Sequence, residues 1–258
     1  MTNSTNTALF NYVLGLADDA LILGQRTSEW CSRGPFLEED IALSNLALDY
    51  IGRARMFYQY AAQIQGMGKT EDDLAYFRDE REFTNLVINE LPNFDFAFSI
   101  VRQYLLDVHA CLYLEQLSNS KDQRLSEIAA KAIKETRYHL KRSETWVLQL
   151  GQGTEESAKR MQDALDELWG YTPELFISSE AELALSGEEG EASIAVNRES
   201  LRHLWLERVT AHMLTSGLVI PEQNWQVVGG RNGDHSEHLG HLLSEMQILQ
   251  RSYPGLEW

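Results

Sequence analysis

The chain has 258 residues and 43% of them are hydrophobic, which is enough for a sizeable core and excludes an intrinsically disordered protein. Only 5 prolines and 2 cysteines occur, so the composition favours helices over an all-β fold and indicates neither a disulfide framework nor a zinc site. Thirty-nine acidic against 22 basic residues give a formal net charge of −17, which disfavours nucleic acid and anionic membranes as partners.

The N-terminal residues 1–19 carry no basic segment ahead of their apolar stretch, which soon meets Asp18 and Asp19. We therefore expect neither a signal peptide nor a membrane-spanning helix at this end. Cys31 and Cys111 stand alone, as free thiols do in a reducing compartment, so the sequence predicts a cytoplasmic protein.

Apolar residues at helical spacing predict four long helices, over residues 7–30, 37–65, 93–117 and 123–150. Short links join the first helix to the second and the third to the fourth, so each pair is expected to form an antiparallel hairpin. Between the hairpins lies a longer crossover, residues 66–92, with its own helical pattern over 71–89. Three further helices are expected, at 155–169, 198–216 and 235–251.

Two hairpins joined by one long crossover are the connectivity of ferritin-like bundles. We therefore predict an all-α fold, a ferritin-like four-helix bundle with additional C-terminal helices, in a single domain over residues 1–258. Such a bundle can hold a di-iron centre built from one carboxylate on each of two helices and a Glu-x-x-His pair on each of the other two. Counting outward from the two hairpin turns brings acidic residues of all four helices to a similar height: Asp19 with Asp18 one step off, Asp49, Asp107 and Glu135.

The histidines that a di-iron centre needs are missing at this height. Three residues after Asp49 stands Gly52, and three residues after Glu135 stands Tyr138. His139 is present one position further on, about 100° round the helix. Neither Glu-x-x-His pair is therefore intact.

Two cations stand one helical turn from these acids, Lys131 before Glu135 and Arg53 after Asp49. Because an unpaired buried charge is costly, either cation could replace iron as the partner of a buried carboxylate. A metal-free site filled by salt bridges is one interpretation. Two alternatives stay open: the acids face solvent or cap helices, or the chain is itself a di-iron oxidase that uses His139.

Six strings, in the same order along the chain, resemble the PaaC family of bacterial phenylacetyl-CoA epoxidase subunits, and the resemblance covers residues 9–258. The strings are LADDALILGQRTSEWCSRGP, EEDIALSNLALDYIGRAR, LAYFRDEREFTNL, KAIKETRYHLKRSETWVLQLGQGTEES, LDELWGYTPELF and EHLGHLLSEMQILQRSYPGLEW.

This resemblance implies a ferritin-like, cytoplasmic protein of aerobic phenylacetate degradation. It implies that a related subunit, PaaA, carries the di-iron centre that epoxidises the ring of phenylacetyl-CoA, and that a reductase with FAD and an iron–sulfur centre delivers electrons from NADPH. The chain itself is then expected to bind no cofactor and to be the non-catalytic structural partner of PaaA and the other subunits. The residues Gly52 and Tyr138, in place of histidines, agree with that role.

The crossover is denser in charge than a packing helix needs, and two interpretations stay open for it. Its side chains either form a solvated helix face or meet the catalytic subunit and the phenylacetyl-CoA bound at a shared interface. The resemblance favours the second interpretation for Arg78, Arg81, Glu82, Phe83, Thr84 and Asn85, with a further candidate contact at Leu183, Ala184 and Leu185. A stand-alone acyl-CoA-binding bundle is a weaker alternative for the whole chain.

The string His235, His238 and His241 has a spacing that invites a metal interpretation, but its three members do not share one tight helix face. We expect instead a capping box of Asp234 and Glu237 at the start of the last helix, with the histidines at the surface.

Overall fold

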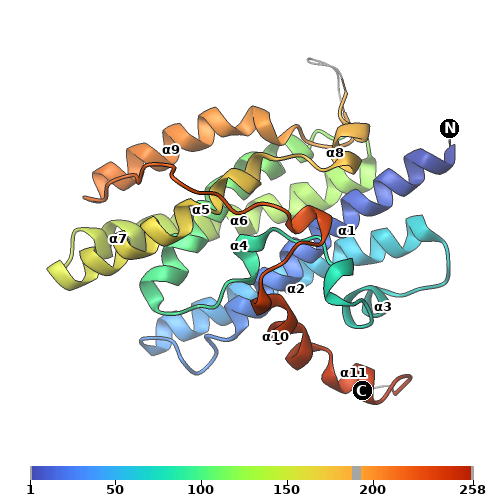
Figure 1. Ribbon diagram of the computed structural model, residues 1–258, viewed down its shortest axis with the longest axis horizontal. Helices are drawn as coiled ribbons and strands as arrows, with labels where there is room; N and C mark the ends of the chain where they lie inside the picture. Colours follow the sequence, from blue (N-terminus) through green and yellow to red (C-terminus); the bar gives the residue numbers. More distant parts are fainter. Residues whose placement is uncertain (1, 188–192, 257–258) are drawn as a thin grey trace. The chain divides into compact units, whose positions relative to one another are not determined.

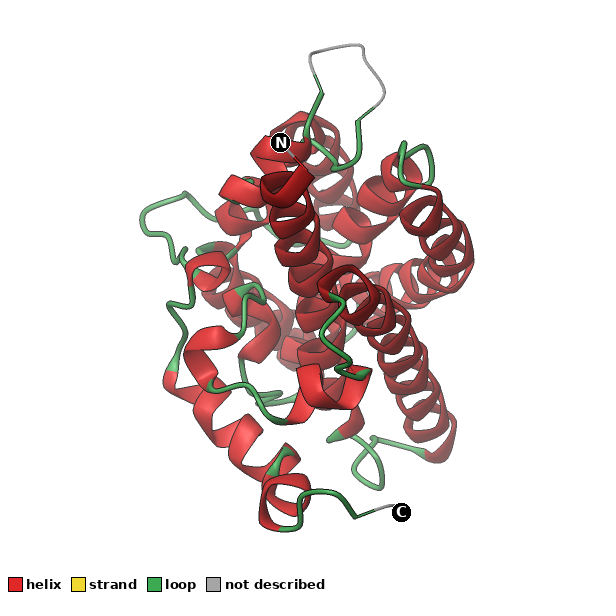
Figure 2. Cartoon of the chain, turned by 90° about the vertical axis from the view of Figure 1, so that its right-hand side faces the viewer, coloured by secondary structure: helices red, strands yellow, loops and turns green. Residues whose placement is uncertain are grey.

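The computed structural model describes residues 2–187 and 193–256, and every regular element in these residues is a helix (Figures 1 and 2). The chain forms two compact units, each discontinuous in sequence. The all-helical prediction is confirmed. The two expected hairpins also occur, α1–α2 in the first unit and α5–α6 in the second, with the long crossover between them, which is the connectivity of a ferritin-like bundle. A single domain stays a prediction.

The first unit comprises residues 1–92, 179–185 and 228–258. Its framework is the hairpin of α1 (Thr2–Ser28) and α2 (Leu37–Gln65), which pack along each other. Short elements complete the unit: α3 (Glu71–Tyr76), η1 (Glu80–Glu82), α4 (Val87–Glu90), α8 (Glu180–Leu185), η4 (Gly230–Asn232), α10 (Glu237–Met246) and α11 (Ile248–Ser252).

Helix α1 is the most apolar helix of this unit. The stretch Ser4–Ser28 is long and apolar enough to cross a membrane, yet 67% of its most apolar part is buried inside the protein. Val13, Ala17 and Ile22 are completely buried, which is the pattern of a core helix that packs inside a globular unit.

Local chemistry fixes the turn between α1 and α2. The backbone N–H of Gly34 donates a hydrogen bond to Oδ2 of Asp40 at 3.1 Å. A Cβ atom at Gly34 would lie 2.7 Å from the Asp40 backbone, so only glycine allows this approach. At its other end, α2 stops at Gly66 in the left-handed conformation, where the Gly66 N–H binds the carbonyl of Ala62.

The second unit comprises residues 93–178 and 186–227. Helix α5 (Phe96–Leu117) lies at its centre, buried at every residue from Ala97 to His109, and packs against α6 (Gln123–Gly151) and α7 (Glu155–Trp169). The remaining elements are η2 (Thr172–Phe176), η3 (Arg198–Leu201) and α9 (Arg202–Thr215). Trp205 of α9 joins α9 to α5 because its indole N–H donates to the carbonyl of Leu105 at 3.0 Å.

Two of the predicted helices, 37–65 and 155–169, agree with the structure at both ends. The expected helical pattern over 71–89 is wrong as one element, because α3, η1 and α4 are separated by non-helical backbone. In that backbone the N–H groups of Thr84 and Leu86 donate to Asp18 and Asp19 of α1 instead of to helix carbonyls. The predicted last helix likewise divides at Gln247 into α10 and α11.

Candidate functional site

Asp18 lies at the centre of a buried polar cluster in the first unit. Its Oδ1 accepts hydrogen bonds from the hydroxyl of Tyr58 at 2.6 Å and from Nη2 of Arg78. Its Oδ2 accepts from Nη1 of Arg78 at 3.1 Å, from the N–H of Thr84 at 2.9 Å and from the Thr84 hydroxyl at 3.2 Å. Both carboxylate oxygens are therefore fully engaged by protein donors, and Asp18 is not accessible to solvent.

Arg78 is the cation of this cluster, with a side chain that is only 9% exposed. Besides binding Asp18, it donates from Nε to the carbonyl of Leu74 at 2.6 Å and from Nη1 to the carbonyl of Glu82 at 2.7 Å. Its guanidinium carbon lies 4.1 Å from the ring centroid of Phe83. The guanidinium thus closes the turn of the crossover on itself and ties that turn to α1.

The ionisation of this cluster follows from its burial. Burial lowers the pKa of Arg78, but the negative charge of Asp18 outweighs it and holds the pKa above its ordinary value. Burial, followed by the adjacent Asp18 charge, raises the pKa of Tyr58 well above its ordinary value. Tyr58 therefore stays a neutral donor and Arg78 stays a cation, which is the pairing that a buried carboxylate requires.

Asp19 anchors a second set of contacts one residue further along α1. Its Oδ1 accepts from the N–H of Leu86 at 2.8 Å and from the side-chain amide of Asn89 at 3.1 Å. Its Oδ2 pairs with Nη2 of Arg231 at 2.5 Å. Arg231 also donates to the carbonyl oxygens of Gly15 and Thr84, so Asp19 joins α1 to both the crossover and the C-terminal segment.

On α2 the structure corrects the predicted register of the metal site. Asp49 is only half-buried, and Gly52 is exposed with no atom within 4 Å of where its Cβ would lie. The side chains that α2 buries are Tyr50 and Arg53, whose guanidinium carbon lies 5.3 Å from the Tyr50 ring centroid. The interior i, i+3 pair of α2 is therefore Tyr50 and Arg53, one residue beyond the predicted pair, and it has no carboxylate.

Helix α6 shows the same offset in the second unit. Glu135 is half-buried and Tyr138 is 59% exposed, whereas Thr136 and His139 are buried. The interior pair on α6 is thus Thr136 and His139, again with no carboxylate. Counting residues along a helix axis matches heights but does not fix rotation, and one residue turns a side chain by about 100°.

Asp107 of α5 is buried, as the prediction requires, but it too is bound by protein donors. The side-chain amide of Gln103 donates to its Oδ1 at 2.7 Å, and the hydroxyl of Ser143 on α6 donates to its Oδ2 at 2.8 Å. Lys131 is exposed, and Arg53 is buried. The proposed roles of Lys131 and Arg53 as replacements for metal stay predictions.

The residues do not fit a di-iron centre. A carboxylate that already accepts five hydrogen bonds, two of them from a guanidinium, cannot also bridge two metal ions. Within residues 2–187 and 193–256, no group of three or more His, Cys, Asp or Glu side chains could hold a metal ion.

The side chains predicted to contact a partner divide between interior and surface of the first unit. Arg78, Phe83, Asn85 and Leu185 are buried, because the turn of the crossover folds inward around Asp18. Thr84 is half-buried and uses its N–H and hydroxyl on Asp18. The residues that remain exposed are Arg81, Glu82, Leu183 and Ala184.

The prediction for the histidine string is wrong in two respects. The residue that caps α10 is Ser236, whose hydroxyl accepts from the N–H of His238, and Asp234 lies outside the helix. His235 is not at the surface, because its side chain is fully buried against Glu90.

Sequence reasoning missed Tyr58 and Arg231, which bind the two aspartates of α1. These residues lie 40 and 212 positions from their partners, so no local spacing could have identified them.

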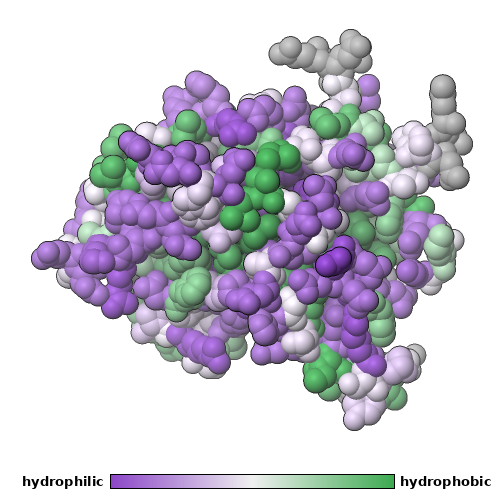
Figure 3. Space-filling view, viewed as in Figure 1, coloured by the Kyte–Doolittle hydropathy of each residue, from purple (hydrophilic) through white to green (hydrophobic). Residues whose placement is uncertain are grey.

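Helix α2 also carries an apolar face that nothing in its own unit covers. Leu37, Ile41 and Leu48 are 70%, 53% and 65% exposed, and with the bare Gly52 they fall within about 60° around the helix. This face contrasts with the mostly hydrophilic, purple surface in Figure 3, on which hydrophobic residues form only separate green patches.

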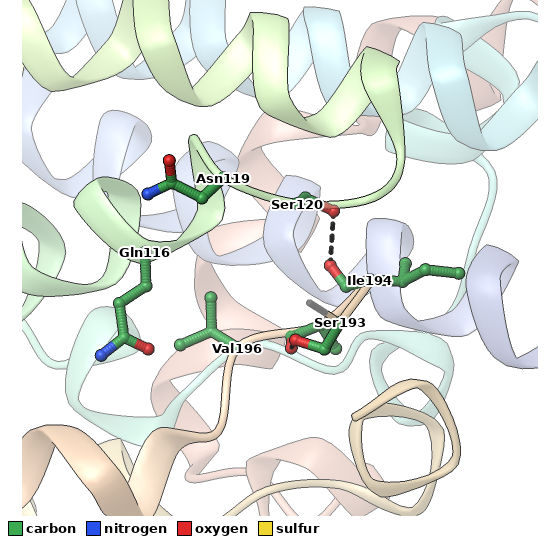
Figure 4. Close-up of a pocket in the computed structure, with 7 residues that line it drawn as sticks. Gln116, Asn119, Ser120, Ser193, Ile194 and Val196 are labelled. Atoms are coloured by element: carbon green, nitrogen blue, oxygen red, sulfur yellow. Dashed lines mark hydrogen bonds between the residues drawn. The ribbon is translucent and has the colours of Figure 1, made fainter. Parts of the chain in front are cut away.

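A small pocket of about 200 Å³ lies in the second unit, between the α5–α6 turn and residues 193–196 (Figure 4). The hydroxyl of Ser120 donates to the carbonyl of Ile194 at 2.7 Å, and the N–H of Lys121 donates to the carbonyl of Ser193 at 2.9 Å. The side chains that line the pocket are neutral, Gln116 and Asn119 among them. It therefore offers no charge for a phosphate group.

Hairpin–crossover–hairpin connectivity, together with interior acids bound by protein donors, defines a ferritin-like helical protein without the ligand set of a metal centre. The chain belongs to the family described as phenylacetic acid catabolic protein, whose sequence model matches residues 1–258. One relative is the C subunit of the 1,2-phenylacetyl-CoA epoxidase of Escherichia coli (strain K12). It is 47% identical over 247 residues, which are 96% of this chain and 98% of the relative.

Proposed function

We propose that this chain is a non-catalytic structural subunit of a phenylacetyl-CoA epoxidase complex in aerobic phenylacetate catabolism. The relative that is 47% identical over nearly its whole length carries the name of such a subunit. The single structural observation that carries the non-catalytic role is the ion pair of Asp18 with Arg78, since a guanidinium occupies the carboxylate that a metal would need. The chain binds no cofactor of its own.

The partner in this proposal is a PaaA-like subunit that carries the di-iron centre, together with the other subunits of the complex. A reductase with FAD and an iron–sulfur centre delivers electrons from NADPH, and phenylacetyl-CoA binds at the shared interface. The complex works in the cytoplasm, without nucleic acid or membrane. These assignments rest on the family resemblance, and the net charge of −17 supports the absence of nucleic acid and anionic membrane.

The apolar face of α2 supports a partner-binding role. A protein that works alone rarely keeps three large aliphatic side chains this exposed along one helix face. Gly52 adds a position without a side chain, where the backbone of a partner helix can come close. Among the residues of the crossover, Arg81 and Glu82 remain exposed and can form polar contacts at the rim of such an interface.

Iron analysis tests the non-catalytic role. The full chain, purified alone and after incubation with Fe(II), is expected to hold less than stoichiometric iron, and iron in a complex with a PaaA-like chain should match the partner content. Two irons bound per chain in the isolated protein would overturn the proposal and favour a di-iron oxidase. Measurable binding of phenylacetyl-CoA to the isolated chain would favour the acyl-CoA-binding alternative instead.

A surface variant tests the partner role. Leu48→Glu places a charge on the exposed face of α2, so it should leave the fold intact and weaken co-purification with a PaaA-like chain by at least tenfold, as for a residue at an interface centre. Leu214→Glu on α9 is the matched control, because Leu214 is also exposed, at 61%. Equal co-purification of both variants and the unmodified chain would remove α2 from the interface.

A further inference from the structure

His235 lies in the C-terminal segment between η4 and α10, and its ring bridges two parts of the crossover. Nε2 lies 2.8 Å from the carbonyl oxygen of Phe83, and Nδ1 lies 3.4 Å from Oε2 of Glu90. A carbonyl oxygen only accepts, so Nε2 must carry a proton. Nδ1 and Oε2 then need a second proton between them, because two lone pairs would otherwise face each other.

Glu90 shares the burial of its partner. Both side chains are 0% exposed. The other carboxylate oxygen, Oε1, accepts from the N–H of Ser236 at 3.1 Å, and the Glu90 carbonyl accepts from Nε of Arg26 at 2.9 Å. Glu90 thus binds the start of α10 through two successive residues, and no solvent is available to replace the proton between it and His235.

Other charges surround the pair. Glu80, Arg81 and Asp234 line a pocket of about 380 Å³ together with His235, and Arg26 approaches from α1. Burial lowers the pKa of His235, but the hydrogen bonds to Glu90 and to the Phe83 carbonyl, with the charges of Glu90 and Glu80, outweigh it and raise the pKa above its ordinary value.

The C-terminal segment that His235 anchors supports the turn of the crossover from outside. Gly233, in the left-handed conformation, packs so closely that a Cβ there would lie 2.5 Å from the Arg81 carbonyl oxygen. Further along, the side-chain amide of Gln247 donates to the carbonyls of Ala75 and Arg78 at 3.2 and 3.1 Å. Release of the segment would leave these carbonyls without their donors.

We propose that His235 and Glu90 form a proton-dependent latch that fastens residues 228–247 to the crossover and opens when the proton between the two side chains is lost. A histidine whose pKa is raised in the folded state contributes stability that is fully present below its unfolded pKa. That contribution is lost as the pH rises through the folded pKa. Across this window the opening equilibrium constant increases by up to about tenfold per pH unit.

Hydrogen–deuterium exchange of the full chain tests the latch without a partner, so its outcome does not depend on the proposed function. Protection factors, corrected for intrinsic exchange, are measured from about pH 6 to about pH 9, a range that spans an ordinary and a raised histidine pKa. Amides of α10 are expected to lose at least tenfold in protection over this range, whereas amides of α6 keep theirs. Constant protection of α10 in the unmodified chain would overturn the proposal.

Two variants separate the latch from general loosening. His235→Gln can still donate to the Phe83 carbonyl but cannot titrate, and Glu90→Gln keeps an acceptor for Ser236 while it loses its charge. In both variants the protection of α10 should no longer depend on pH. His203→Gln on α9 is the control, since His203 is exposed and should leave the pH dependence unchanged. A pH dependence that persists in His235→Gln would contradict the proposal, and the unmodified chain alone decides it if a variant does not fold.

Discussion

Replacement of Arg78 by Met tests the energetics of the buried cluster. The variant keeps the apolar stem that packs on Phe83 but leaves the carboxylate of Asp18 buried with only Tyr58 and Thr84 as donors. Removal of one partner of a buried ion pair costs about 3–5 kcal/mol. Two further hydrogen bonds, to the carbonyls of Leu74 and Glu82, are also lost at about 0.5–1.5 kcal/mol each, which places the expected loss at the upper end of that range.

The assay is urea denaturation of the full chain, with the free energy of unfolding taken from the midpoint and slope. Arg55→Met is the matched control, since Arg55 also joins α2 to the crossover, through Glu71 at 3.1 Å, but its side chain is 69% exposed. That surface pair should cost no more than about 1 kcal/mol. The double variant Asp18→Leu with Arg78→Met should lose less than the sum of the two single variants, by about 2 kcal/mol. A loss for Arg78→Met no greater than that of the control would refute this reasoning.

Two further predictions concern the second unit and the cysteines. Burial, with a smaller contribution from Asp107, raises the pKa of Cys111 to about 12, so a thiol reagent at about pH 8 should label the exposed Cys31 rapidly and Cys111 only after unfolding. Rapid labelling of both thiols in the native chain would contradict the buried position of Cys111. Trp205→Ala should lower the free energy of unfolding by about 3–5 kcal/mol, because Trp205 is buried against Trp169 and Phe176. Trp225→Ala, at a half-exposed position, should cost less in the same denaturation assay.

Helix positions could be predicted because local signals determine them. Helix α7 begins after Thr154, whose hydroxyl accepts from the N–H of Ser157 three residues on, and α2 ends at a glycine that adopts a positive φ. These capping signals involve neighbours in sequence, so the residue pattern alone contains them. The absence of an intact Glu-x-x-His pair was also visible before the structure, although the interior positions proved to be Tyr50, Arg53, Thr136 and His139.

The partners of the buried acids could not be predicted in this way. Local spacing suggested Lys131 and Arg53 as cations, whereas the cation that binds Asp18 is Arg78, 60 residues away. The crossover was predicted as a helix because its residues have helical periodicity. Asp18 and Asp19 offer its N–H groups better acceptors than the helix would, and this competition depends on tertiary structure.

The discontinuity of the first unit has a consequence for synthesis of the chain on the ribosome. Asp19 and Arg231 are separated by 212 residues, and at about 5–20 residues per second the ribosome needs roughly 10–40 s to add them. During that interval the crossover carbonyls that bind Arg231 and Gln247 lack their donors. The nascent α1–α2 hairpin must therefore wait, with its apolar helix incompletely covered, until nearly the last residues emerge. Truncation near the C-terminus would leave every molecule in this waiting state, open to chaperones and proteases.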